Sequence, residues 1–186
     1  MTRPGPGRTR ARLGLALAAL VALLVAGATG WYPYAKLSPA AADATLRPGD
    51  SAEVGGVRYR LDTFSVAPSL PAEERGDPAV SGPAGSVLVL VVVSETVLDH
   101  GLALDELTCE ATLTDDAGTV WRTDSDFTSA LARPAAYGCG DTSSSPLRHD
   151  VERPAGFSFV VPTDRVGHLA ARLQLGGEGP TLLLRP

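Results

Sequence analysis

The chain has 186 residues, of which 44 % are hydrophobic, and it carries 16 Lys and Arg against 21 Asp and Glu, for a net charge of −5. This length and apolar content suffice for one folded domain with additional segments. Because phosphate binding requires a basic surface, the acidic balance argues against nucleic acid as a partner.

The N-terminus is organised like a membrane-directed segment. A basic tail, residues 1–12, holds four Arg and no acid, and it precedes an uncharged apolar stretch over residues 13–31. As a helix that stretch would span roughly 28 Å, close to the ~30 Å hydrocarbon core of a bilayer. Basic residues that flank a membrane-spanning helix stay on the cytoplasmic side. We therefore expect a single-pass signal anchor in the cell membrane, with the N-terminus inside and the C-terminal domain outside.

A cleaved signal peptide is the alternative for the same segment. It would use residues 13–25 as its hydrophobic region and the small residues 26–28 as its cleavage site. The aromatic residues within 31–34 lie where an outer interfacial belt would be, which favours a retained anchor. Gly27 and Gly30 have the spacing of a small-residue helix contact, so the helix could also meet a partner membrane protein.

Residues 32–50, rich in Ala, Pro and Ser, are predicted to be a linker, followed by an extracytoplasmic domain over 51–186. Gly55 and Gly56 have the pattern of a two-residue hairpin turn. Residues 57–61 alternate apolar and polar side chains, as in a strand with one exposed face.

The alternating pattern changes phase after residue 61. Phe64 and Val66 continue the apolar series in the opposite phase, which predicts a β-bulge near Asp62 and Thr63. Residues 67–85 contain four Pro and three acidic residues and are predicted to be a long polar loop.

Residues 86–96, SVLVLVVVSET, form the stretch around which the domain is expected to be built. Residues 87–93 are seven apolar residues in a row, five of them Val, too few to cross a bilayer. Val is restricted at χ1 and fits a pleated surface, so a strand is favoured over a helix. The absence of polar alternation predicts a strand buried on both faces.

Further strands are predicted downstream. Residues 107–114 alternate, residues 115–118 form a hairpin turn and residues 119–123 return; alternation also marks 157–161 and 169–175, and residues 181–184 are the last predicted strand. Residues 124–150 are expected to be irregular. Seven or eight short strands, with no helix outside the membrane segment, predict an all-β fold, an antiparallel two-sheet sandwich.

The order of these signals supports a resemblance that rests on residues 54–59, 87–93, 113–118 and 154–162. The chain resembles the small immunoglobulin-like extracytoplasmic domains of unknown function found in Gram-positive bacteria. The resemblance implies an immunoglobulin-like β-sandwich outside the membrane, and it supplies no catalytic residues.

Cys109 and Cys139 are the only cysteines. In an exported domain two cysteines predict one structural disulfide. Closing a loop of about 30 residues is worth roughly 3–4 kcal/mol in the chain-entropy description. The chemical alternative is a nucleophilic Cys139 assisted by His149.

Metal sites are not expected. His100, His149 and His168 share no ligand spacing. Four acidic residues flank one hairpin and could share a calcium ion, or could instead accept hydrogen bonds in turns; they are Asp115, Asp116, Asp124 and Asp126.

These patterns predict a non-enzymatic binding or scaffolding module at the cell envelope, held to the membrane by its N-terminal helix and able to meet an envelope protein. No cofactor is expected. The alternatives are an accessory subunit of a membrane protein complex and a secreted calcium-binding domain.

Overall fold

The computed structural model describes residues 42–72, 77–131, 138–140, 146–177 and 179–186. The predicted basic tail, membrane segment and most of the linker lie outside these ranges. Within the described ranges, no helix is both long and apolar enough to cross a membrane.

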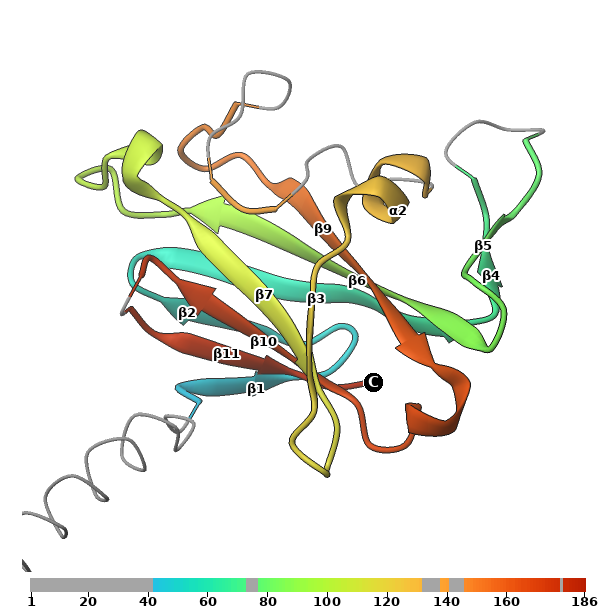
Figure 1. Cartoon of the computed structure of the whole chain (residues 1–186). Helices are drawn as coiled ribbons and strands as arrows, with labels where there is room; N and C mark the ends of the chain where they lie inside the picture. Colours follow the sequence, from blue (N-terminus) through green and yellow to red (C-terminus); the bar gives the residue numbers. More distant parts are fainter. Residues whose placement is uncertain (1–41, 73–76, 132–137, 141–145, 178) are drawn as a thin grey trace, which may run out of the picture. The chain divides into compact units, whose positions relative to one another are not determined.

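Two β-sheets pack face to face around one core (Figure 1). The five-stranded sheet has the order β1 (Ala44–Leu46), β11 (Thr181–Leu184), β10 (Ala170–Leu175), β7 (Cys109–Thr114) and β8 (Val120–Arg122). The four-stranded sheet has the order β2 (Ser51–Val54), β3 (Val57–Ala67), β6 (Ser86–Val97) and β9 (Arg153–Pro162). Neighbours are antiparallel except β1 and β11, which are parallel. The predicted β-sandwich is thus confirmed, while its immunoglobulin-like character stays a prediction.

Strand β6 lies between β3 and β9 and pairs with both over most of its length. Its residues 87–95 are all buried. Alternate side chains face the core between the sheets, whereas Leu88, Leu90 and Val92 belong to a second apolar cluster on the outer face. Burial on both faces, predicted from the unbroken apolar run, is confirmed.

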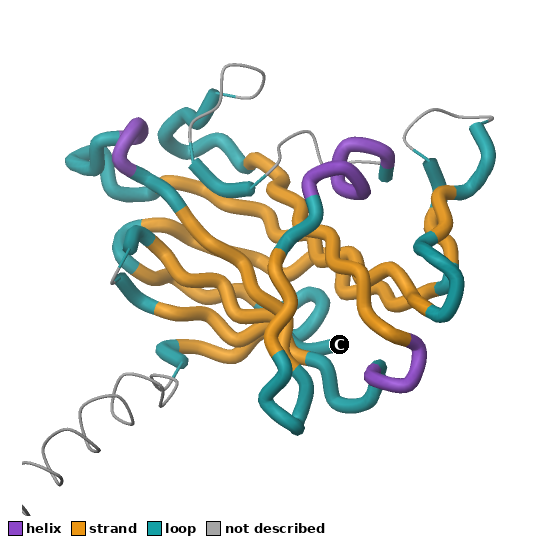
Figure 2. Tube along the Cα trace, viewed as in Figure 1, coloured by secondary structure: helices purple, strands orange, loops and turns teal. Residues whose placement is uncertain are grey.

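The outer face of β6 is covered by short elements that the sequence did not reveal (Figure 2). They are the two-stranded ribbon of β4 (Ser69–Leu70) and β5 (Val80–Ser81), and the helix α2 (Ser125–Ala130). The expectations of a polar loop over 67–85 and of no helix outside the membrane segment were therefore wrong. Two-residue strands and a six-residue helix are too short to produce a detectable periodicity.

The bulge and the first hairpin are as predicted. The register between β3 and β6 shifts between Leu61 and Thr63. Gly55 and Gly56 have φ values of 59° and 77°, the left-handed backbone that a type I′ hairpin turn requires. The carboxylate of Asp62 accepts hydrogen bonds from Arg60 at 2.7 Å and from the Ser94 hydroxyl at 2.6 Å.

The sandwich begins earlier than the predicted boundary at residue 51. Strand β1 lies inside the segment that the sequence assigned to a linker, and it pairs with β11 at the other end of the chain. The Asp43 carboxylate accepts the N–H of Thr181 at 2.7 Å, which fixes the start of both strands. The remaining short elements are the 3-10 turns η1 (Leu104–Glu106) and η2 (Thr163–Arg165).

Replacing Val89 or Val91 with Asp should abolish folding. Both side chains have 0 % exposure, and an unpaired buried carboxylate costs several kcal/mol, comparable to a domain's total stability of about 5–15 kcal/mol. Circular dichroism during heating measures the effect, with Val120→Asp as the control because Val120 is 58 % exposed. A cooperative transition in either core variant would contradict the assignment of β6 as the central strand.

Candidate functional site

Three polar side chains form a row across neighbouring strands at one end of the four-stranded sheet. Tyr59 on β3 is in register with Glu95 on β6, and Glu95 is in register with Arg153 on β9. All three are buried, with exposures of 3 %, 1 % and 5 %. Since Tyr59 and Glu95 are in phase with core residues of their strands, this row occupies positions that would otherwise be apolar.

Glu95 and Arg153 form a buried ion pair, with Arg153 Nη2 donating to Glu95 Oε1. Burial raises the pKa of the Glu95 carboxyl, while Arg153 and a hydrogen bond from the Gly140 backbone act in the opposite direction. Arg153 Nη2 also donates to the carbonyl of Gly138 at 3.4 Å. The segment 138–140 therefore supplies backbone groups to both members of the pair.

The disulfide between Cys109 and Cys139 fastens that segment to β7, with a Cα–Cα distance of 5.4 Å. The Cys139 N–H also donates to Cys109 Sγ at 3.2 Å. Gly138 and Gly140 have φ values of 81° and 90°, the left-handed region that favours glycine. A Cβ on Gly140 would overlap with the Leu107 carbonyl oxygen. The loop can thus approach the ion pair closely only because glycine flanks the cysteine on both sides.

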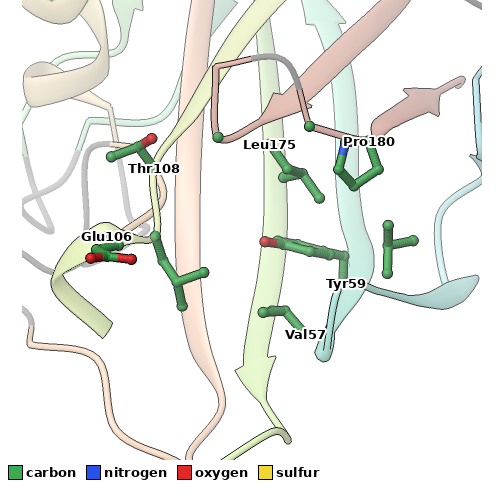
Figure 3. A pocket seen from close by; sticks show the side chains of 11 residues that line it. Val57, Tyr59, Glu106, Thr108, Leu175 and Pro180 are labelled. Carbon is green, nitrogen blue, oxygen red and sulfur yellow. The ribbon is translucent and has the colours of Figure 1, made fainter. Parts of the chain in front are cut away.

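A pocket of about 210 Å³ opens next to Tyr59, at the end of the sandwich (Figure 3). Side chains and backbone from both sheets line it: Val54, Gly55, Val57, Tyr59, Glu106, Leu107, Thr108, Leu175, Gly176, Gly179 and Pro180. Its walls are mainly apolar, and Glu106 and Thr108 are exposed on one side.

A second pocket, of about 250 Å³, lies beside the disulfide, between β7, β9 and α2. Its lining includes Cys109, Thr128, Gly138 and Phe157. Thr128 is engaged there, because its hydroxyl lies 2.6 Å from the Ser158 hydroxyl, which in turn donates to the Asp124 carbonyl at 2.7 Å. The Thr128 hydroxyl therefore serves to attach α2 to β9.

Two of the three histidines lie side by side, which the sequence did not indicate. The rings of His100 and His149 stack with centroids 4.8 Å apart, and His100 Nε2 lies 2.9 Å from Asp150 Oδ2. Their separation in the sequence hides this contact. Across the part of the chain that the structure describes, no group of three or more His, Cys, Asp or Glu could hold a metal ion.

The acidic residues considered as calcium ligands serve turns and a helix cap. Asp115 Oδ1 accepts the Thr119 N–H at 2.7 Å and closes the hairpin between β7 and β8. Asp124 is the N-cap of α2 and accepts the N–H groups of Asp126 and Phe127. Asp116 is exposed. The turn interpretation thus accounts for Asp115 and Asp124, and the disulfide removes the thiol that the Cys139–His149 alternative requires.

Comparisons with known proteins give the fold and no activity. No protein-family model and no curated protein matches the chain. A conserved hypothetical protein from Bacillus anthracis has 7 % identity and a TM-score of 0.50, over 73 % of this chain and 94 % of that one. An uncharacterized β-sandwich protein from Clostridium difficile has 8 % identity and a TM-score of 0.49, over 77 % and 93 %. The yjhA protein from Bacillus subtilis has 9 % identity and a TM-score of 0.48, over 75 % and 98 %. The chain is thus similar in fold to the conserved hypothetical protein from Bacillus anthracis.

Replacing Cys109 and Cys139 together with Ser should lower the melting temperature by at least several degrees. The loop they close is 30 residues long, and its closure is worth roughly 3–4 kcal/mol. The first proteolytic cut should fall within residues 124–150. Reductant should lower the melting temperature of the wild-type protein by the same amount and leave the melting temperature of the double variant unchanged. Two free thiols, found by mass spectrometry in exported material purified without reductant, would contradict the disulfide.

Replacing Glu95 with Gln should cost about 3–5 kcal/mol of unfolding free energy, because it leaves the buried Arg153 charge without its carboxylate. The double variant Glu95→Leu, Arg153→Met should regain most of that loss, since both charges are then absent. Urea unfolding measures both. Glu152→Gln, which breaks an exposed ion pair with Arg60, should change stability little. Equal losses in the single and double variants would show that the pair is not the source of the effect.

Proposed function

We propose that the chain is a membrane-anchored, extracytoplasmic and non-enzymatic module that binds or scaffolds other components at the cell envelope. The observation that carries this proposal is the disulfide built into the domain. Disulfides persist in oxidising compartments and are rare in the cytoplasm. Together with the apolar segment 13–31 and its basic flank, it supports a domain held outside the membrane.

Several side chains of types that often act in catalysis are engaged in structural contacts, and this supports a binding role. Both cysteines are oxidised, Asp124 caps a helix, and the buried carboxylate Glu95 is paired with Arg153. Acid–base or nucleophilic catalysis requires such groups to face a substrate instead. The two pockets of the sandwich offer concave sites with mainly apolar walls, of the kind that hold a small ligand.

The anchored location can be tested in the native host. The protein should stay in the membrane fraction after alkaline carbonate washing, and its N-terminus should begin upstream of Leu13, because the segment 13–31 is long enough to remain in the bilayer. A C-terminal epitope should be removed by protease added to protoplasts, whereas an N-terminal epitope should be protected. A soluble product that starts near Thr29 would show that the segment is a cleaved signal and would overturn the anchor.

A second experiment separates a self-contained module from an accessory subunit. The full chain, and a form in which a cleavable signal replaces residues 1–31, are each crosslinked in cells and purified in detergent. If both capture the same envelope protein, the domain itself makes the contact. If capture requires residues 1–31, the membrane segment makes it and the chain acts as an accessory subunit.

A further inference from the structure

We propose that the pocket beside Tyr59 is a binding site for a small ring compound that carries one neutral hydrogen-bond acceptor, such as an amide carbonyl, and no negative charge. This inference rests on the proposed binding function and gives it a ligand class. It is carried by the size of the pocket, the polar group inside it and the charges around it.

The size of the pocket fits a ring with a small substituent. An apolar cavity of about 150 Å³ holds benzene, and this pocket encloses about 210 Å³. Its walls are formed by the β2–β3 hairpin, the segment from η1 to β7, and, after β10, Gly176, Gly179 and Pro180. Val57, Leu107 and Leu175 provide apolar surface on these three sides, so a flat apolar body can be desolvated between them.

The Tyr59 hydroxyl is the polar group that the ligand would meet. Tyr59 is 97 % buried by residue area, given its exposure of 3 %, yet no group among the described residues hydrogen-bonds its hydroxyl. Figure 3 shows the ring between Val57 and Leu175, with the oxygen directed toward the side where Glu106 and Thr108 lie. The hydroxyl oxygen is not among the fully buried side-chain atoms that lack a partner, so it reaches the pocket, where a ligand acceptor would replace water as its hydrogen-bond partner.

The charges around Tyr59 determine the kind of acceptor. Burial and the nearby Glu95 carboxylate raise the pKa of the Tyr59 phenol, so the hydroxyl stays protonated and acts as a donor. Glu106 adds a carboxylate at the exposed side of the pocket. The charge of Glu95 is compensated by Arg153, so Glu106 is the acid that would repel an anionic ligand, whereas a neutral carbonyl accepts the hydrogen bond without that cost.

The backbone around the pocket keeps its walls in place. The Gly176 N–H donates to the Thr108 carbonyl at 2.8 Å, and the Leu175 N–H donates to the Pro180 carbonyl at 2.9 Å. A Cβ on Gly179 would overlap with the Leu175 carbonyl oxygen, so Gly179 approaches the end of β10 closely. A site with fixed walls loses little entropy when a ligand enters.

The test uses benzamide as the probe and the full chain in detergent, with ¹³C-labelled Val and Leu methyl groups observed by NMR. Benzamide should shift the methyl signals of Val57, Leu107 and Leu175 in a saturable way and leave those of Val120 unchanged. Benzoate, which has the same size and a negative charge, should bind at least tenfold more weakly. Tyr59→Phe should weaken benzamide binding roughly two- to tenfold, the worth of one hydrogen bond.

A blocking variant controls for binding elsewhere. Thr108→Trp places a large ring at the exposed side of the pocket and should abolish the benzamide shifts, whereas Val120→Trp, at an exposed position on β8, should preserve them. The proposal is overturned if benzamide produces no saturable shifts, if Tyr59→Phe binds as tightly as the wild type, or if Thr108→Trp binds normally. Such a result would leave the fractionation and crosslinking outcomes unaffected, so failure of the pocket can be distinguished from failure of the envelope function.

Discussion

The rest of the structure depends on one constraint: strand β6 needs backbone hydrogen-bond partners along both edges and apolar side chains packed against both faces. Its backbone pairs with β3 and β9, and its side chains are buried from residue 87 to residue 95. Each fully buried Val or Leu contributes about 1.5–3 kcal/mol, but only if something covers it. The opposing sheet covers the inner face. The ribbon β4–β5 and the helix α2 cover the outer face, which explains why segments that look like loops carry Leu70, Phe127 and Leu131.

The same strand produces the polar row at the end of the sandwich. Successive side chains of a strand point to opposite faces of the sheet, so every second residue shares a face. Glu95 therefore faces the core, as Val91 and Val93 do. A lone carboxylate there would cost several kcal/mol, and the register with β9 places Arg153 directly opposite to compensate it. Desolvating two charges is itself costly, so the pair depends on additional hydrogen bonds. The segment 138–140 supplies them, and the disulfide holds that segment in place.

The sequence predicted those features of the fold that arise from residues close together in the chain. The unbroken apolar run identified β6, the change of phase at Phe64 identified the bulge, and paired glycines identified the first hairpin. Strand β1 was missed because its pairing partner lies at the opposite end of the chain. The polar row was missed because register between distant strands is not encoded in either segment alone. The stacked histidines were missed because His100 and His149 lie far apart in the sequence. A signal for the row was nevertheless present: Glu95 and Arg153 are each in phase with apolar core residues of their own strand.

The pocket and the disulfide are connected through the short segment 107–109. Leu107 lines the pocket while its carbonyl abuts Gly140, and the Thr108 carbonyl accepts the N–H of Gly176 from the opposite wall. Cys109 is the next residue and carries the disulfide. Opening the disulfide would release the loop that abuts Leu107, so the pocket wall and the buried ion pair would loosen together. By thermodynamic linkage, a ligand that required the ordered wall would also stabilise the closed loop.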